Sequence, residues 1–183
     1  MKGIILYEGK YGATRDYAEW MGKELRLPVL RSGELGDGNL SVLDFIVIGS
    51  SVYTGKLQAG NWLKRNCASL RKLKIFLFIV CGTPATEKEK LARIVADNVP
   101  AEIRNLCEIY FLRGRMRRKD LSVKDRLLLR AGSLLAKNPA ARKSMLEDFD
   151  YVRKENIVPL VLGVQQFLVR KKGSTSSSVF AEN

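Results

Sequence analysis

The sequence predicts an α/β domain in which helices cover both faces of a doubly wound, five-stranded parallel sheet of strand order 2-1-3-4-5. Short, unbroken apolar segments are typical of parallel strands buried on both faces. Stretches with helical periodicity separate these segments along the chain. Such alternation produces βαβ units with right-handed crossovers, which place helices on both sides of the sheet. The 183 residues, 46% of them apolar, suffice for one core of this kind.

Five segments are predicted to be strands. Four are continuous apolar segments bounded by charge, glycine or proline, at residues 4–7, 45–48, 75–81 and 109–112. Residues 28–31 are shorter and begin with proline, so we assign them to an edge of the sheet, where proline is tolerated.

Four amphipathic patterns predict the helices that pack on the sheet: residues 14–26, 59–70, 87–98 and 156–170. In the first, Tyr17, Ala18, Met21 and Leu25 recur at helical spacing. In the predicted arrangement, ligands bind outside the carboxyl ends of the strands. We therefore expect the functional loops to follow the first, third and fourth strands.

The domain is expected to span residues 1–172, with a basic helical insertion at 113–147 after the fifth strand. Residues 173–183 begin with a Ser/Gly-rich stretch and are predicted to be a disordered tail.

The composition excludes several kinds of chemistry. Because the chain has no histidine, it has no Ser-His-Asp or Cys-His nucleophile pair, no histidine zinc site and no facial iron triad. The three cysteines are widely separated, which predicts neither a disulfide framework nor a thiolate metal site and favours a reducing, cytoplasmic location. No apolar segment approaches the ~20 residues of a membrane-spanning helix.

The loop after the first strand has the composition of a phosphate-binding turn. It consists of Gly9, Lys10, Tyr11, Gly12, Ala13 and Thr14 and leads directly into a helix. The glycines allow backbone N–H groups to turn inward, the threonine offers a hydroxyl, and the helix N-terminus attracts anions. Lys10 would add a full positive charge. An ordinary strand-to-helix turn is the alternative.

Two further loops follow the third and fourth strands. The first contains Ser51, Val52, Tyr53, Thr54 and Gly55, and its tyrosine can stack on a flat heteroaromatic ring or pack on the next helix. The second contains Gly82, Thr83 and Pro84. Cys81 before it is expected to be a small buried side chain.

These loops, in this order, resemble the flavodoxin-domain family that includes the menaquinone-dependent protoporphyrinogen dehydrogenases. The resemblance rests on residues 9–14, 48–53 and 81–84, extends to 113–127 in the insertion, and covers residues 2–170. It implies a flavodoxin-like fold with an FMN site, in which the first loop holds the phosphate and the other two flank the isoalloxazine ring.

The positive charge is concentrated in the insertion. The formal net charge is +13, and residues 113–147 hold 11 of the 32 Lys/Arg residues but only three of the 19 Asp/Glu residues. A helix is predicted from Ser122 and Asp125 to a point before Pro139, with Val123, Leu127, Ala131 and Leu134 on one side.

Two interpretations of the insertion remain open. Its apolar side can dock on the domain and leave the charges solvated. Alternatively, it meets an anionic membrane, at the inner face, or an acidic partner. Nucleic acid is the weaker variant, because no recognition fold accompanies the charges. The candidate surface residues are Arg115, Arg117, Arg118, Lys119, Arg126 and Arg130.

Two function classes follow. The first is an FMN oxidoreductase of the protoporphyrinogen dehydrogenase type, which takes electrons from a small-molecule reductant and passes them to a quinone or redox protein. The flavin carries the electrons, so no catalytic side chain is required. The positive charge favours an electron-accepting dehydrogenase over a low-potential donor. The second class is a non-catalytic electron carrier, or an FMN-free module that acts through its basic insertion.

Overall fold

The computed structural model describes residues 1–35, 39–135 and 147–178. It contains the predicted five-stranded parallel sheet, formed by β1 (Gly3–Glu8), β2 (Val29–Arg31), β3 (Phe45–Tyr53), β5 (Lys74–Cys81) and β6 (Cys107–Arg113). Its strand order is β2-β1-β3-β5-β6, with the two-residue strand β4 (Lys56–Leu57) paired to β3 outside this path. Counting only the parallel strands, this is the order 2-1-3-4-5, so the predicted fold is confirmed.

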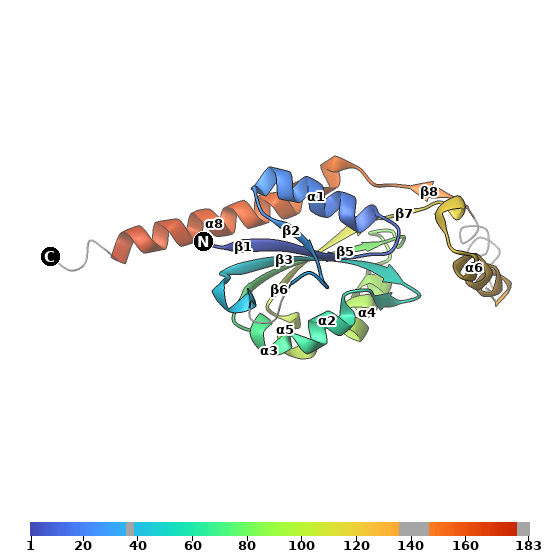
Figure 1. The fold of residues 1–183 in the computed structure, drawn as a ribbon, viewed down its shortest axis with the longest axis horizontal. Coiled ribbons are helices and arrows are strands. Elements are labelled where there is room, and N and C mark those ends of the chain that lie inside the picture. Colours follow the sequence, from blue (N-terminus) through green and yellow to red (C-terminus); the bar gives the residue numbers. More distant parts are fainter. Residues whose placement is uncertain (36–38, 136–146, 179–183) are drawn as a thin grey trace.

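Helices lie on both faces of the sheet (Figure 1). One face carries α1 (Ala13–Leu25) and α8 (Val158–Ser178), and the other carries α2 (Gly60–Arg65), α3 (Cys67–Leu70), α4 (Lys88–Asn98) and α5 (Ala101–Arg104). A short 3-10 turn, η1 (Asn39–Val42), precedes β3.

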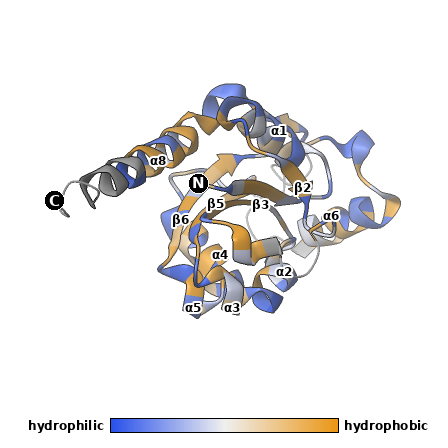
Figure 2. Cartoon of the chain, turned by 60° about the vertical axis from the view of Figure 1, so that its left-hand side comes forward, coloured by the Kyte–Doolittle hydropathy of each residue, from blue (hydrophilic) through white to orange (hydrophobic). Residues whose placement is uncertain are grey.

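Each face of the sheet has its own hydrophobic core. Phe45 and Val47 of β3 belong to the cluster beneath α1 and α8, whereas Ile46 and Ile48 belong to the cluster on the opposite face. This division follows from the alternation of side chains along a strand. Because both faces are covered, the central strands contain continuous apolar segments, and orange predominates on β3 and β5 in Figure 2.

The helices on the α2–α5 face differ from the prediction in two places. The helix predicted at 59–70 is divided into α2 and α3 at Asn66, whose side-chain amide donates a hydrogen bond to the Trp62 carbonyl at 3.0 Å. The helix α5 was not predicted.

The insertion lies at the carboxyl ends of the parallel strands (Figure 1). It contains β7 (Arg115–Met116), the 3-10 turn η2 (Arg118–Asp120) and α6 (Val123–Leu135), and β8 (Phe149–Asp150) follows it directly and pairs with β7. The predicted start of α6 is confirmed, since the Asp125 N–H donates to the Ser122 hydroxyl at 3.2 Å. Residues 136–146, where the helix was predicted to end, lie outside the described residues. The β7–β8 ribbon was not predicted.

The C-terminal helix is longer than predicted. After the 3-10 turn η3 (Lys154–Ile157), α8 runs from Val158 to Ser178 and so includes residues 173–178. Once a helix is nucleated, each further residue adds a hydrogen bond, and this favours extension even through Ser and Gly. Residues 179–183 lie outside the described residues. None of the helices within the described ranges is long and apolar enough to cross a membrane.

Candidate functional site

A cavity of about 410 Å³ lies at the carboxyl ends of β1, β3 and β5, where the fold predicts a ligand site. The predicted cofactor residues that line it are Lys10, Tyr11, Ala13, Thr14, Ser51, Val52, Tyr53, Thr54 and Gly82. The other wall comes from β7, α6 and β8, through Met116, Leu128, Leu129, Gly132 and Phe149 among others. The structure therefore brings the three predicted loops together and closes them with the insertion.

The backbone of the first loop is shaped for close approach to a ligand. Gly12 has a φ of 83°, which favours glycine, and it precedes α1 without a side-chain cap. The first helical hydrogen bond runs from the Asp16 N–H to the Gly12 carbonyl at 2.9 Å. The N–H groups of Ala13, Thr14 and Arg15 consequently have no acceptor within the helix, and they form an anion-binding terminus.

Two buried hydroxyl groups in this loop have no hydrogen-bond partner among the described residues. They are the Oγ1 atom of Thr14 and the phenol of Tyr11, and both residues line the cavity. Thr14 is only 1% exposed. Because burial of an unpaired hydroxyl is costly, these groups are available to hydrogen-bond a polar ligand or water in the cavity.

Gly9 and Gly12 border the opposite side of the first loop, where a second hollow lies. A Cβ atom at Gly9 would lie 2.6 Å from Thr14 Oγ1. Gly9 therefore permits the loop to pack against the threonine even though it does not line the main cavity.

The second predicted loop is a β-hairpin. β3 continues to Tyr53 and pairs with β4, with Tyr53 opposite Lys56. Thr54 and Gly55 form the turn, with φ values of 46° and 75°, and positive φ at both central residues matches the twist of a hairpin. β3 extends beyond the predicted end at residue 48 because residues 49–51 continue the parallel pairing with β1 and β5, and residues 52–53 pair with β4.

Asn98, at the end of α4, holds this hairpin in place. Its side chain accepts a hydrogen bond from the Leu57 N–H at 3.1 Å and donates to the Gly55 carbonyl at 2.9 Å. Sequence reasoning missed this residue, because its partners are more than forty positions away.

A buried carboxylate connects the insertion with the first two loops. Asp125 of α6 accepts a hydrogen bond from Lys10 Nζ at 2.6 Å and another from the Tyr53 hydroxyl. The Lys10 ammonium also lies 4.6 Å from the centroid of the Tyr53 ring. The hydrogen bond with Asp125 raises the pKa of Lys10. Thus Lys10, predicted to face a phosphate, is paired with Asp125, whose role the sequence pattern had suggested only as part of a helix start.

Only one of the three predicted residues in the third loop lines the main cavity. Gly82 lines the cavity, and a Cβ atom there would lie 3.1 Å from the Phe149 ring, so the two pack closely. Gly55, Thr83 and Pro84 do not line the cavity. Cys81 is buried as expected, and burial raises the pKa of its thiol.

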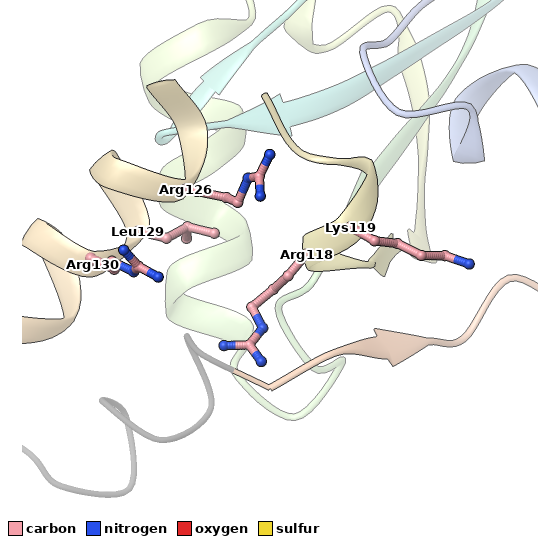
Figure 3. Close-up of a pocket in the computed structure, with 5 residues that line it drawn as sticks. All are labelled: Arg118, Lys119, Arg126, Leu129 and Arg130. Carbon is pink, nitrogen blue, oxygen red and sulfur yellow. The ribbon is translucent and has the colours of Figure 1, made fainter. Parts of the chain in front are cut away.

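The six basic residues predicted to form one surface fall into two groups. Arg115 forms an ion pair with Asp16 of α1 at 2.6 Å, which holds the insertion to the domain. Arg117 forms an ion pair with Asp150 of β8, also at 2.6 Å, at the base of the insertion. Arg118, Lys119, Arg126 and Arg130 line a separate hollow of about 260 Å³ between η2 and α6. Figure 3 shows that Arg118, Arg126 and Arg130 gather around this hollow, whereas Lys119 extends away from them.

Among residues 1–35, 39–135 and 147–178, no cluster of three or more Cys, Asp or Glu side chains is arranged to hold a metal ion. The polar groups that converge on the main cavity are hydroxyls, backbone amides and one ion pair.

Comparisons with known proteins identify a family. A sequence model described as a flavodoxin domain matches residues 4–142. No curated protein matches the chain. Among solved structures, a flavodoxin from the domain Archaea is 18% identical, with a TM-score of 0.44, over 69% of this chain and 93% of that one. A Lactobacillus acidophilus flavoprotein in complex with FMN is 16% identical, with a TM-score of 0.44, over 61% of this chain and 91% of that one.

Proposed function

The chain belongs to the flavodoxin domain family, and from this premise we propose that it binds FMN in the cavity at the carboxyl ends of its strands and transfers electrons through it. The observation that carries the proposal is the buried Oγ1 atom of Thr14 at the N-terminus of α1, which has no hydrogen-bond partner within the described ranges. A phosphate bound to this loop would accept its hydrogen bond.

The first loop fits the phosphate of FMN. Phosphate is attracted by the uncapped N-terminus of α1 and accepts hydrogen bonds from its backbone N–H groups. The Thr14 and Tyr11 hydroxyls add donors that find no acceptor elsewhere in the described part of the chain. Lys10 supplies positive charge nearby, although it is shared with Asp125.

The remaining cavity fits a flat aromatic ring. Tyr53 from the β3–β4 hairpin and Phe149 from β8 both line it, and each offers an aromatic surface. The volume of about 410 Å³ falls within the range of roughly 300–1,000 Å³ that is common for cofactor sites. Asn98 positions the hairpin, and Gly82 allows Phe149 to approach the end of β5.

When bound, FMN supplies the electron-transfer chemistry, and the protein supplies position and electrostatics. The side chains of α6 then limit access of water to the cavity, because Leu128 and Leu129 form part of its wall. Asp125 and Lys10 place a neutralised pair of charges beside the site, which avoids an isolated buried charge.

The more specific part of the proposal is an oxidoreductase of the protoporphyrinogen dehydrogenase type with a quinone as electron acceptor. Two features favour it over a simple electron carrier. Met116, Leu121, Leu128 and Leu129 give one side of the cavity an apolar lining, which suits a flat, weakly polar reactant. The net charge of +13 favours acceptance of electrons over donation at low potential.

Flavin content is the first test. The purified protein is expected to be yellow, to release FMN on denaturation, and to recover the flavin spectrum when the apoprotein is titrated with FMN. If neither bound flavin nor binding in the titration is found, the FMN proposal is wrong. Oxidation of protoporphyrinogen by the FMN-loaded protein, with and without a quinone, then separates the enzyme from the carrier. Absence of oxidation in the FMN-loaded protein would leave the carrier as the function.

A further inference from the structure

The apolar side of α6 faces solvent. Val123, Leu127 and Leu134 are spaced so that they share one side of a helix with about 3.6 residues per turn. Their exposed fractions are 67%, 58% and 69%. The side of α6 that packs on the domain instead carries Asp125, Leu129 and Gly132, which line the main cavity. The expectation that the apolar side docks on the domain is therefore wrong.

The exposed stripe of Val123, Leu127 and Leu134 is bordered by cations. Arg126 and Arg130 are one helical turn apart on the adjacent edge of α6 and, with Arg118, gather around the hollow in Figure 3. Arg126 and Arg130 form no ion pair with another residue of the described ranges, whereas Arg118 lies 3.5 Å from Asp148. Aliphatic and cationic side chains thus share one outward surface.

We propose that α6 and η2 form a docking surface for an anionic phospholipid bilayer. The guanidinium groups around the hollow bind lipid phosphates, and Val123, Leu127 and Leu134 enter the boundary between headgroups and acyl chains. A helix with cations along the edge of an exposed aliphatic face is the pattern of helices that lie in a membrane interface. Two signals, one electrostatic and one apolar, are needed for stable binding of this kind, and α6 carries both.

The bilayer is favoured over an acidic protein partner by the exposed aliphatic side chains. The arginines alone would suffice to attract an acidic protein. Attraction to its charges does not account for leucines that are more than half exposed. A membrane surface uses both classes of side chain at once.

This surface also bears on electron transfer, in a step that rests on the proposed FMN site. The opposite side of α6 lines the main cavity, and a helix is only about 10–12 Å across. If the protein binds a membrane through α6, its main cavity lies roughly one helix diameter from the lipid. Reactants dissolved in the bilayer could then reach a cofactor bound in that cavity.

Vesicle binding tests the proposal with the FMN-loaded full chain. Co-sedimentation is compared on vesicles of phosphatidylcholine alone and of an equimolar mixture with phosphatidylglycerol. We expect binding to the anionic vesicles that weakens as salt is added. The double variant Arg126→Gln, Arg130→Gln is expected to bind about 25-fold more weakly, at roughly fivefold per cation near the surface. The variant Leu127→Ser, Leu134→Ser is expected to lose about tenfold.

The matched control is the double variant Arg65→Gln, Arg71→Gln, which removes the same charge from exposed positions near α2 and α3. It is expected to bind the anionic vesicles nearly as well as the unaltered chain. Failure of the unaltered chain to bind anionic vesicles at low salt would overturn the proposal, as would an equal loss in the control. Since flavin content is measured on the same samples, loss of vesicle binding with FMN retained refutes only the membrane surface.

Discussion

The Lys10 ammonium lies 2.6 Å from a carboxylate oxygen of Asp125, which stands 115 positions later in the chain. The two side chains differ in environment, since Lys10 is 40% exposed and Asp125 only 3%. This ion pair connects the loop that follows β1 with the first turn of α6. The wall that the insertion adds to the cavity is therefore held by the same loop that we expect to bind the cofactor phosphate.

The pair makes stability depend on pH in a defined direction. Its hydrogen bond raises the pKa of Lys10 in the folded protein above the ordinary value of 10.5. The stabilisation is therefore complete below pH 10.5 and is lost as the pH rises through the higher, folded-state pKa. In Asp125→Asn this alkaline loss should be absent. The free energy of unfolding in urea is measured for both proteins as the pH is raised above 10.5. The same dependence on pH in the unaltered chain and in Asp125→Asn would contradict the prediction.

Thr14→Val separates a ligand-binding role from a structural one. The substitution keeps the shape of the side chain and removes a buried hydroxyl that has no partner in the described residues. Stability should stay the same or increase, whereas FMN affinity should fall about 10- to 100-fold, as expected for a lost hydrogen bond to a charged group. Fluorescence titration of the apoprotein with FMN measures the effect. The exposed Thr86→Val serves as the control and should bind FMN normally.

Gly9→Ala should damage the first loop. Its new Cβ atom would lie 2.6 Å from Thr14 Oγ1 and 2.8 Å from Thr14 Cβ, so the loop must shift. We expect a loss of about 1–3 kcal/mol in the free energy of unfolding, typical of an overpacked site, together with weaker FMN binding. Gly33→Ala is the matched control, because a Cβ atom there meets nothing within 4 Å. Equal behaviour of the two variants in thermal unfolding and FMN titration would refute the described loop geometry.

Asn98→Ala should loosen the β3–β4 hairpin. The substitution leaves the Leu57 N–H and the Gly55 carbonyl without their side-chain partner. A destabilisation of about 2–3 kcal/mol is expected from these unpaired groups. FMN binding should weaken as well, because Tyr53 lines the cavity from this hairpin. Urea unfolding and FMN titration give the two readouts. A variant as stable as the unaltered chain would show that Asn98 does not hold the hairpin.

The parallel sheet could be predicted because strands that are buried on both faces are continuous apolar segments in the sequence. Residues 75–81 are apolar without interruption, and they form most of β5. The first loop could also be predicted from the sequence, since Gly9, Gly12 and Thr14 lie within six positions and lead into a helix.

The remaining features depend on contacts between distant positions. Asp125 meets Lys10, Asn98 meets Gly55, and Met116 pairs with Phe149, and none of these contacts has a periodic signal. The orientation of α6 is a similar case. Its aliphatic side would pack inward by periodicity alone, but Asp125 is buried in its ion pair with Lys10 and the aliphatic side faces solvent.

The β7–β8 ribbon brings together the two ends of the insertion. Arg115 lies opposite Asp150, and the Gly114 carbonyl beside it accepts a hydrogen bond from the Tyr151 N–H at 3.1 Å. The chain therefore leaves the domain and returns to it at one ladder. Because the entropy of loop closure grows only slowly with length, segments of other lengths and compositions can be exchanged at this junction without changing the sheet. The ribbon is thus the position at which this α/β domain can accept insertions that differ in the surface they present.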